Sequence, residues 1–390
     1  MVTRKEQLDF IDNLKIFLTS LVIVHHAGQP FGPGGWWFYE GKESISWLGS
    51  FFFVNASFFM SLFFFLSGYF ISDSVRRKGI AHYARERILR LGIPILFGFL
   101  IVIPILMYFY YLNFRNYGNI SYFKYFINVY FGQEAKPENW TGPSWPDMNF
   151  GHLWFLEHLL FYTLIYLLMQ KLPLSPKFKG KSMINYYKVF LFGFCLSSVT
   201  FFVRIWHPVN NWTGFLWIIQ TEFAHVPHYV FFFTTGLFAK KNNWVNDLTM
   251  RFGFFWSFIA IILILVKYFG NPSIIPFSKG GLTYEALFTS FFETYLGVSL
   301  IIGLIIFFRE KMNFSNIISK EIAKCSFLVY VIHVPVVVLL QYTIQNAQIG
   351  PTLRFLVISV SSIFLCYSIS FISLKLFQNY LKAIGRLSGK

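Results

Sequence analysis

Charged residues and cysteines are both scarce in this sequence of 390 residues. Only 13% of the residues are Asp, Glu, Lys or Arg, whereas a soluble domain has about 25%. Hydrophobic residues make up 55% and aromatic residues 22%, which excludes both an ordinary soluble enzyme and a disordered chain. The three cysteines, Cys195, Cys325 and Cys366, lie far apart in apolar runs without a C-x-x-C pair, so the sequence contains no disulfide framework.

The sequence contains long apolar runs. A helix needs about 20 mostly apolar residues to cross a bilayer. No small-residue cleavage pattern follows the first run, so it is a retained helix rather than a signal peptide. The sequence therefore predicts an all-α, polytopic membrane protein with about ten transmembrane helices, forming one membrane-embedded domain over residues 1–390 without a separate soluble domain. The runs are 10–28, 47–71, 92–112, 153–171, 187–206, 224–239, 252–269, 284–308, 322–344 and 354–377.

Basic residues are distributed unevenly between alternate connecting segments. If both termini lie inside the cell, 24 Lys and Arg residues fall on the inner side and 8 on the outer side. Cytoplasmic loops collect Lys and Arg, so this distribution predicts that both termini are inside. Most of the net charge of +16 then reflects topology rather than a surface for polyanions, and we expect no nucleic-acid partner.

The first run contains Asp12, Lys15 and His26. Ionisable residues inside a spanning helix are costly, so they indicate function. Lys15 and His26 are eleven residues apart, which places them on one helix face about 16 Å apart along the axis. Asp12 lies three residues before Lys15 and can form an ion pair with it. The alternative is that Lys15 extends to the inner interface and His26 sits at the outer one.

Several polar residues gather near the predicted outer ends of the fourth and sixth helices. A neutral imidazole accepts a proton near pH 7, so these histidines favour a polar cavity open to the outer side. A ring of amphipathic side chains at the interface is the alternative. The spacings would also suit a metal, but no H-E-x-x-H pattern is present, so we expect none. The residues are His152, Trp154 and Glu157 at the start of the fourth helix, and Glu222, His225 and His228 at the start of the sixth.

A basic segment connects the second and third runs. Arg87 and Arg90 are three residues apart and share a helix face, with Arg85 close by. As an amphipathic cytoplasmic helix this segment would lie on anionic lipid. Guanidinium groups also bind phosphates in a two-pronged manner, so both interpretations stay open on charge alone.

Four elements, in order along the chain, resemble the bacterial acyltransferase-3 family of integral membrane acyltransferases. The most specific is the Ile11-Asp12-Asn13-Leu14-Lys15 stretch, followed after ten residues by His26. The family usually has Arg in place of Lys15, and Lys lacks the planar fork that a two-pronged contact requires. The second element is Phe64 to Tyr69, in which Gly68 favours close helix packing, followed by Arg87 to Arg90 as R-x-x-R. The third is Leu153 to Leu156, and the fourth is Ser326 through Tyr330 to His333. The stretches around Asp12 and after His26 are most similar to the glucan-modifying branch of the family.

This resemblance implies a ten-helix membrane O-acyltransferase of the bacterial cytoplasmic membrane. Acyl-CoA, with acetyl-CoA as the default, would be the cytoplasmic donor, and a hydroxyl of an extracytoplasmic carbohydrate would be the acceptor. Arg87, Arg90 and Arg85, helped by Lys15, would bind the CoA phosphates. His26 would act as general base on the acceptor hydroxyl or transiently carry the acyl group, and Asp12 would orient Lys15. The residues expected along the acceptor path are His152, Trp154, Glu157, His225, His228, Tyr330 and His333.

Tryptophans on the predicted outer side are further candidates for the acceptor site. The flat indole faces of Trp36, Trp37, Trp140, Trp145 and Trp154 would stack on sugar rings. An aromatic belt at the membrane interface is the alternative for these residues.

A transporter or flippase for a glycan or lipid-linked substrate is the competing function. It also explains ten helices with intramembrane charge, but transporters typically show repeats with paired broken helices, and this sequence shows none. A structural or sensory membrane protein would leave the aligned Lys15 and His26 unexplained. Besides its substrates, membrane lipid is the expected partner.

Overall fold

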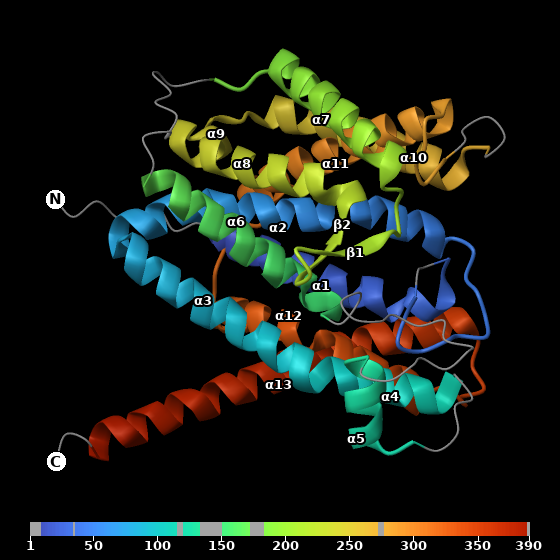
Figure 1. Ribbon diagram of the computed structural model, residues 1–390. Coiled ribbons are helices and arrows are strands. Elements are labelled where there is room, and N and C mark those ends of the chain that lie inside the picture. Colours follow the sequence, from blue (N-terminus) through green and yellow to red (C-terminus); the bar gives the residue numbers. More distant parts are fainter. Residues whose placement is uncertain are drawn as a thin grey trace. The chain divides into compact units, whose positions relative to one another are not determined.

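The fold is known from a computed structural model that describes residues 9–33, 36–114, 120–132, 150–171, 183–271 and 277–387 (Figure 1). Within these ranges, nine helical segments are long and apolar enough to cross a membrane, which confirms an all-α polytopic membrane protein. The sixth predicted run forms the shorter helix α8 (Val226–Asn242), which has 17 residues.

Contacts along the chain group into two compact units. One comprises residues 1–49 and 307–390, and the other comprises residues 50–306. Two long helices each begin in one unit and end in the other: α2 (Leu48–Lys78) and α11 (Tyr284–Lys311).

In the first unit, α1 packs against α12 and α13, and one of its amide side chains bonds the turn that precedes α12. Asn13 of α1 is buried, and its Nδ2 donates to the carbonyl oxygens of Met312 (2.7 Å) and Phe314 (2.8 Å). Asn316 then caps the next helix in a reciprocal capping box with Ser319. Asn13, within the Asp12-Asn13-Leu14-Lys15 stretch, therefore holds the turn that precedes α12. The elements of this unit are α1 (Asp9–Ala27), η1 (Gln29–Phe31), α12 (Ile317–Thr343) and α13 (Pro351–Leu387).

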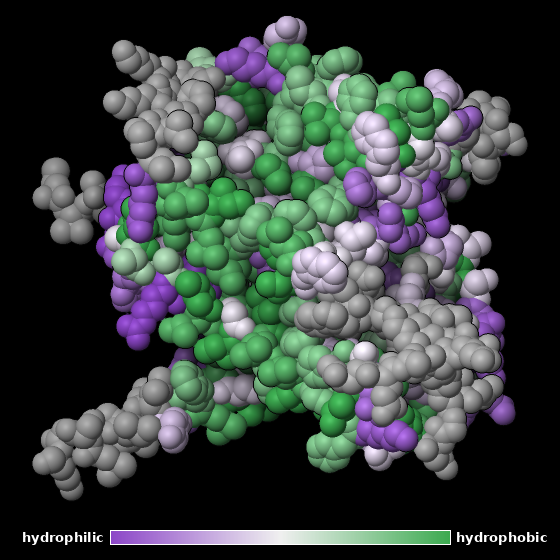
Figure 2. Space-filling view, in the orientation of Figure 1, coloured by the Kyte–Doolittle hydropathy of each residue, from purple (hydrophilic) through white to green (hydrophobic). Residues whose placement is uncertain are grey.

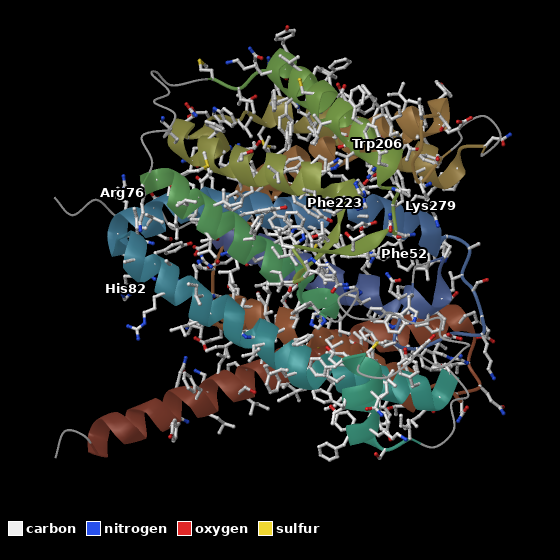
Figure 3. The ribbon with its side chains drawn as sticks, in the orientation of Figure 1. Phe52, Arg76, His82, Trp206, Phe223 and Lys279 are labelled. Atoms are coloured by element: carbon white, nitrogen blue, oxygen red, sulfur yellow. The ribbon has the colours of Figure 1, made fainter. Side chains whose placement is uncertain are left out.

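The second unit holds the remaining elements. Figure 3 shows Arg76 and His82 where α2 ends and α3 begins, at the opposite end of this unit from Trp206 and Lys279. In Figure 2, hydrophobic side chains cover α3 and α6, and hydrophilic ones gather where α2 meets α3. The elements are α3 (Ile80–Phe97), η2 (Gly98–Val102), α4 (Ile103–Phe114), α5 (Tyr122–Lys124), η3 (Tyr125–Tyr130), η4 (Gly151–Leu153), α6 (Trp154–Lys171), α7 (Tyr186–Trp206), β1 (Trp212–Phe215), β2 (Ile219–Glu222), η5 (Phe223–His225), α8, α9 (Trp244–Asp247) and α10 (Met250–Phe269).

Two glycines bring α2 and α8 into backbone contact, which confirms the close helix packing expected at Gly68. A Cβ added at Gly68 would lie 2.1 Å from the carbonyl oxygen of Phe233, and one added at Gly236 would lie 2.2 Å from that of Phe65. No other residue fits at either position without a backbone shift. This contact packs the middle of α8 directly against the backbone of α2.

The third predicted helix is longer than its apolar run. Residues 80–114 form one continuous helical segment, in which α3 passes through Pro94 and the π-helical turn η2 into α4. Arg85, Arg87 and Arg90 therefore lie in the first half of this helix rather than in a separate connecting helix. A run of apolar residues marks only the part of a helix that faces hydrocarbon, so hydropathy misses a basic first half.

A short antiparallel hairpin precedes α8 and was absent from the predicted elements. β1 pairs with β2 so that Trp212 lies opposite Glu222 and Phe215 opposite Ile219. The prediction that Glu222 opens the sixth helix is therefore wrong, because Glu222 is extended and ends β2. The helix begins only at Val226, with Pro227 in its first turn, where a missing N–H costs nothing.

Candidate active site

Helix α1 positions the three candidate catalytic residues of the first unit. Lys15 Nζ lies 3.2 Å from Asp12 Oδ1, so the expected ion pair forms one turn into the helix. Both side chains are partly exposed, at 36% and 51%, so the pair contributes little to stability. His26 lies in the last turn of the same helix, about 16 Å further along its axis.

Three rings surround the imidazole of His26. Trp37 stacks on it at a centroid distance of 5.1 Å and an interplanar angle of 11°, and His333 of α12 lies 5.1 Å away at 32°. The neighbouring His25 makes an edge contact at 5.6 Å. Residues from α1, the following loop and α12 thus form one imidazole and indole cluster, which we call the His26 cluster.

His333 is fully buried, and a backbone contact fixes its tautomer. Its Nδ1 lies 2.6 Å from the carbonyl oxygen of Tyr330. A carbonyl only accepts, so Nδ1 carries the hydrogen, and in the neutral ring the lone pair lies on Nε2. The ring of Tyr330 lies 5.5 Å from that of His333, so both predicted path residues of α12 are adjacent to the His26 cluster.

Gln341 holds the tryptophan of this cluster in place. Its Oε1 accepts a hydrogen bond from Trp37 Nε1 at 2.8 Å, and its Nε2 donates to the carbonyl oxygens of His26 and Ala27 at 3.4 Å. The amide therefore links the indole to the end of α1. A glutamine inside an apolar run gives a weak sequence signal, which explains why it was missed.

The predicted phosphate-binding residues lie in α3 of the second unit. Arg87 Nε donates to the hydroxyl of buried Tyr83 at 2.7 Å, and its guanidinium lies 5.0 Å from the centroid of that ring. Arg85 and Arg90 are exposed on the same helix, and Lys78 pairs with Glu86 nearby. Tyr83 thus fixes one guanidinium in a basic surface that suits a phosphate group.

The start of α6 is joined to the hairpin by hydrogen bonds. Glu157 Oε2 accepts from the backbone N–H of Gln220 at 3.1 Å, and His158 Nε2 lies 3.1 Å from the Gln220 carbonyl oxygen. Trp154 stacks on Tyr229 of α8 at 5.3 Å. His152 lies in η4 and is buried. These predicted acceptor residues are therefore enclosed within the second unit.

Buried charged groups of α7, β2, η5 and α11 form one cluster, which we call the Arg204–Glu293 network. Arg204 Nη1 of α7 lies 2.7 Å from Glu293 Oε2 of α11. The other oxygen of Glu293 lies 3.1 Å from His225 Nε2, and His225 Nδ1 lies 3.0 Å from Glu222 Oε2. The backbone N–H of Asn210 donates to the remaining oxygen of Glu222 at 2.6 Å. All four charged side chains are buried.

The charges of this network determine the state of His225. Burial alone would raise the pKa of Glu222, but the charge of His225 and its hydrogen bond hold that pKa below its usual value. Burial would likewise lower the pKa of His225, but Glu222 and Glu293 raise it to about 9. His225 is therefore an imidazolium at neutral pH, and two carboxylates balance it and Arg204.

His228 lies beside this network in a neutral setting. Its Nε2 lies 3.1 Å from Thr294 Oγ1 and its Nδ1 lies 3.5 Å from Thr200 Oγ1. Among the residues that the structure describes, no group of three or more His, Cys, Asp or Glu side chains is arranged to hold a metal ion.

The predicted site residues thus fall into two groups. Asp12, Lys15, His26, Tyr330 and His333 belong to the first unit. Trp140 and Trp145 lie outside the described residues. The residues of the second unit are Arg85, Arg87, Arg90, His152, Trp154, Glu157, His225 and His228.

The sequence analysis missed Arg204 and Glu293, although a signal for both was present. Glu293 lies nine residues inside α11, and Arg204 lies two residues before the end of α7. The rule that singled out Lys15, that an ionisable residue inside a spanning helix is costly, applies equally to both. Counting Arg204 as an outer loop charge concealed it.

Comparison with known proteins gives the family. No curated protein and no solved structure matches the chain. A sequence profile described as an acyltransferase domain matches residues 8–371 of 390, which include α1, the arginines of α3, α6 and the Tyr330 to His333 segment of α12. The chain therefore belongs to the acyltransferase-3 family and is a membrane acyltransferase.

Proposed function

We propose that the protein is an O-acyltransferase that moves an acyl group, acetyl by default, from cytoplasmic acyl-CoA to a hydroxyl of an extracytoplasmic carbohydrate. The observation that carries this proposal is the contact of His26 with Trp37 and His333. It provides a proton-accepting ring beside a flat indole, at the opposite end of α1 from Lys15. A sugar hydroxyl needs a base of this kind, and a sugar ring binds well to an indole face.

In the proposed reaction His26 acts as general base. It removes the proton of the acceptor hydroxyl while the oxygen attacks the thioester carbonyl, and the carbon–sulfur bond then breaks to release CoA. The thiolate takes up the proton, so the transfer is balanced without another reactant. The lone pair of His333 on Nε2 offers a second proton acceptor in contact with the first ring. If His26 instead carries the acyl group, His333 is the base for the acceptor.

The donor end of the proposed site is basic. Arg87 and Arg90, with Arg85, bind the CoA phosphates in this proposal, and the contact of Arg87 with Tyr83 supports it by fixing one guanidinium. The distribution of 24 against 8 basic residues supports cytoplasmic termini in a bacterial cytoplasmic membrane.

Release of free CoA from acetyl-CoA tests the function directly. The purified protein in detergent should release the CoA thiol, and His26→Ala should reduce that rate by at least about 100-fold, because general base catalysis typically contributes 10²–10⁴. The matched control is His82→Ala, which removes an exposed histidine of α3 and should leave the rate unchanged. Elution and thermal unfolding of each variant show whether it is folded.

Each component of the proposal has its own contradicting outcome. Full thiol release by folded His26→Ala removes His26 from the reaction, and no release by the wild type favours the transporter.

Arg87→Lys keeps the charge and loses the two-pronged contact, so it should raise the KM for acetyl-CoA while the KM for the acceptor stays constant. An acyl label on wild-type protein that hydroxylamine removes and that His26→Ala lacks would identify a covalent carrier. Loss of an acyl mass from surface glycans of cells lacking the gene identifies the acceptor class.

A further inference from the structure

The tip of the hairpin is apolar and exposed. Leu216, Trp217 and Ile218 connect β1 to β2, and they are 60%, 75% and 61% exposed. The base of the hairpin is the opposite, because Gln220, Thr221 and Glu222 are polar and buried. A surface loop in water usually has the reverse pattern, with polar residues at its tip.

The hairpin runs along a membrane-spanning helix. At its base, the ring of Trp212 lies 5.7 Å from that of Trp154, the first residue of α6. Near its tip, Phe215 lies 6.0 Å from Phe161. Seven residues of α-helix and three of strand both cover about 10 Å, so the two elements advance side by side. Figure 1 shows the hairpin beside α6.

This alignment gives the depth of the tip. The N–H of Trp217 donates back to Gly214, so the chain turns rather than advances beyond Phe215, and the tip lies roughly 10 Å past the start of α6, about a third of a hydrocarbon core of about 30 Å. Just beyond this level α6 exposes Leu164, Ile165 and Leu168, which form part of its outward apolar face. The exposed tip is therefore level with an apolar helix surface rather than with the ends of the helices.

The backbone of the turn is suited to an environment without water. The N–H of Trp217 donates to the carbonyl oxygen of Gly214 at 3.1 Å, and the N–H of Ile218 donates to that of Phe215 at 3.3 Å. An unsatisfied backbone group costs several kcal/mol in the bilayer core, and these two N–H groups avoid that cost through internal partners. Leu216 and Trp217 also have positive φ angles of 53° and 64°, where Asn and Gly are the usual residues. Large apolar side chains thus occupy a turn whose backbone favours small or polar ones.

We propose that residues 212–222 form a re-entrant hairpin whose tip lies in the bilayer, with Leu216, Trp217 and Ile218 against the hydrocarbon chains of membrane lipid. Contact with lipid explains why the turn keeps large apolar residues at positive φ. The anchored tip holds the polar base of the hairpin against Glu157 and His158 of α6. The hairpin is therefore a lipid-contacting element that positions the buried polar groups of the second unit.

Spin-label accessibility in a bilayer tests this proposal. The three cysteines are replaced by Ala, and a nitroxide is attached at Trp217→Cys in vesicles of phosphatidylethanolamine and phosphatidylglycerol. Two matched positions bracket the result: Leu168→Cys on the outward face of α6, and Asn211→Cys, exposed at the base of the hairpin. Oxygen partitions into lipid and a nickel chelate into water. The oxygen-to-nickel accessibility ratio at 217 should match that at 168 and exceed that at 211.

Two outcomes would overturn the proposal. A ratio at 217 equal to that at 211 places the tip in water. Low accessibility to both reagents at 217 means that protein, rather than lipid, covers the tip. If the Trp217→Cys chain fails to fold, a label at Ile218→Cys gives the same comparison one residue further along the exposed tip. None of these readouts depends on acyl transfer, so the result stands whether or not the proposed reaction is correct.

Discussion

Removing one charge from the Arg204–Glu293 network should destabilise the protein strongly. The network contains two cations, Arg204 and His225, and two carboxylates, Glu222 and Glu293, so it is neutral as a whole. Glu293→Gln leaves one buried positive charge in excess, at a site where the side chains of Arg204 and Glu293 are 1% and 5% exposed. Breaking a buried ion pair by removing one partner costs about 3–5 kcal/mol.

The substitution also acts on His225. Glu293 is one of the two carboxylates that raise the pKa of His225, so its removal destabilises the imidazolium as well as leaving Arg204 without its carboxylate. We therefore expect a loss of about 3–5 kcal/mol. At about 2 °C per kcal/mol for a large chain, the Tm should fall by roughly 6–10 °C.

A double-mutant cycle separates charge imbalance from loss of packing. Arg204→Met alone leaves a carboxylate in excess, whereas the double variant with Glu293→Gln leaves the neutral pair of His225 and Glu222. The double variant should therefore unfold at a higher temperature than either single variant, measured by tryptophan fluorescence in detergent. Glu321→Gln, at a surface pair with Lys324, is the control and should leave the Tm unchanged. A Tm of Glu293→Gln within 2 °C of the wild type, with about 2 °C per kcal/mol, or additive losses in the cycle, would refute the reasoning.

Three further predictions follow from single contacts. The pKa of His225, raised to about 9 from 6.5, gives stability that is complete below pH 6.5 and lost as the pH rises to 9; the Tm should therefore fall over this range, and the slope should flatten in His225→Gln. Gly68→Ala places a Cβ against the carbonyl oxygen of Phe233 and should cost about 1–3 kcal/mol by overpacking, so an unchanged Tm would contradict close approach of α2 and α8. Gln341→Ala removes the acceptor of Trp37 Nε1; it should lower the free energy of unfolding by about 1–3 kcal/mol and reduce CoA release, and an unchanged free energy of unfolding would contradict a positioning role for this amide.

Hydropathy predicted the helices well because every segment that crosses the bilayer needs about 20 mostly apolar residues. All ten runs form helices, and the local rules for Gly68 and for the pair of Asp12 and Lys15 also held. The pair of Asp12 and Lys15 depends on spacing along one helix, and the close packing at Gly68 depends on the small size of one residue. Both features can be recognised in the sequence without knowing which helices pack together.

The hairpin shows why other features could not be predicted. Its turn residues, Leu216 and Trp217, are neither Asn nor Gly, so the segment between the runs 187–206 and 224–239 lacks the usual turn residues of a hairpin at this point. Burial against α6 and hydrogen bonds with Gln220 decide its structure, and these are contacts between residues about 60 positions apart. The partners of His26 pose the same problem, because His333 lies more than 300 residues away.

The hydrogen bonds of the histidines also indicate which of them is able to act as a base. A base needs a ring nitrogen with a lone pair, and both nitrogens of His225 face carboxylates, which only accept hydrogen bonds. His225 is thus suited to holding the Arg204–Glu293 network together rather than to accepting a proton from a hydroxyl. In the first unit, the contact of His333 Nδ1 with the carbonyl oxygen of Tyr330 places the lone pair of the neutral ring on Nε2. In the proposed reaction the proton acceptors are His26 and His333, whereas the Arg204–Glu293 network links β2, α7 and α11.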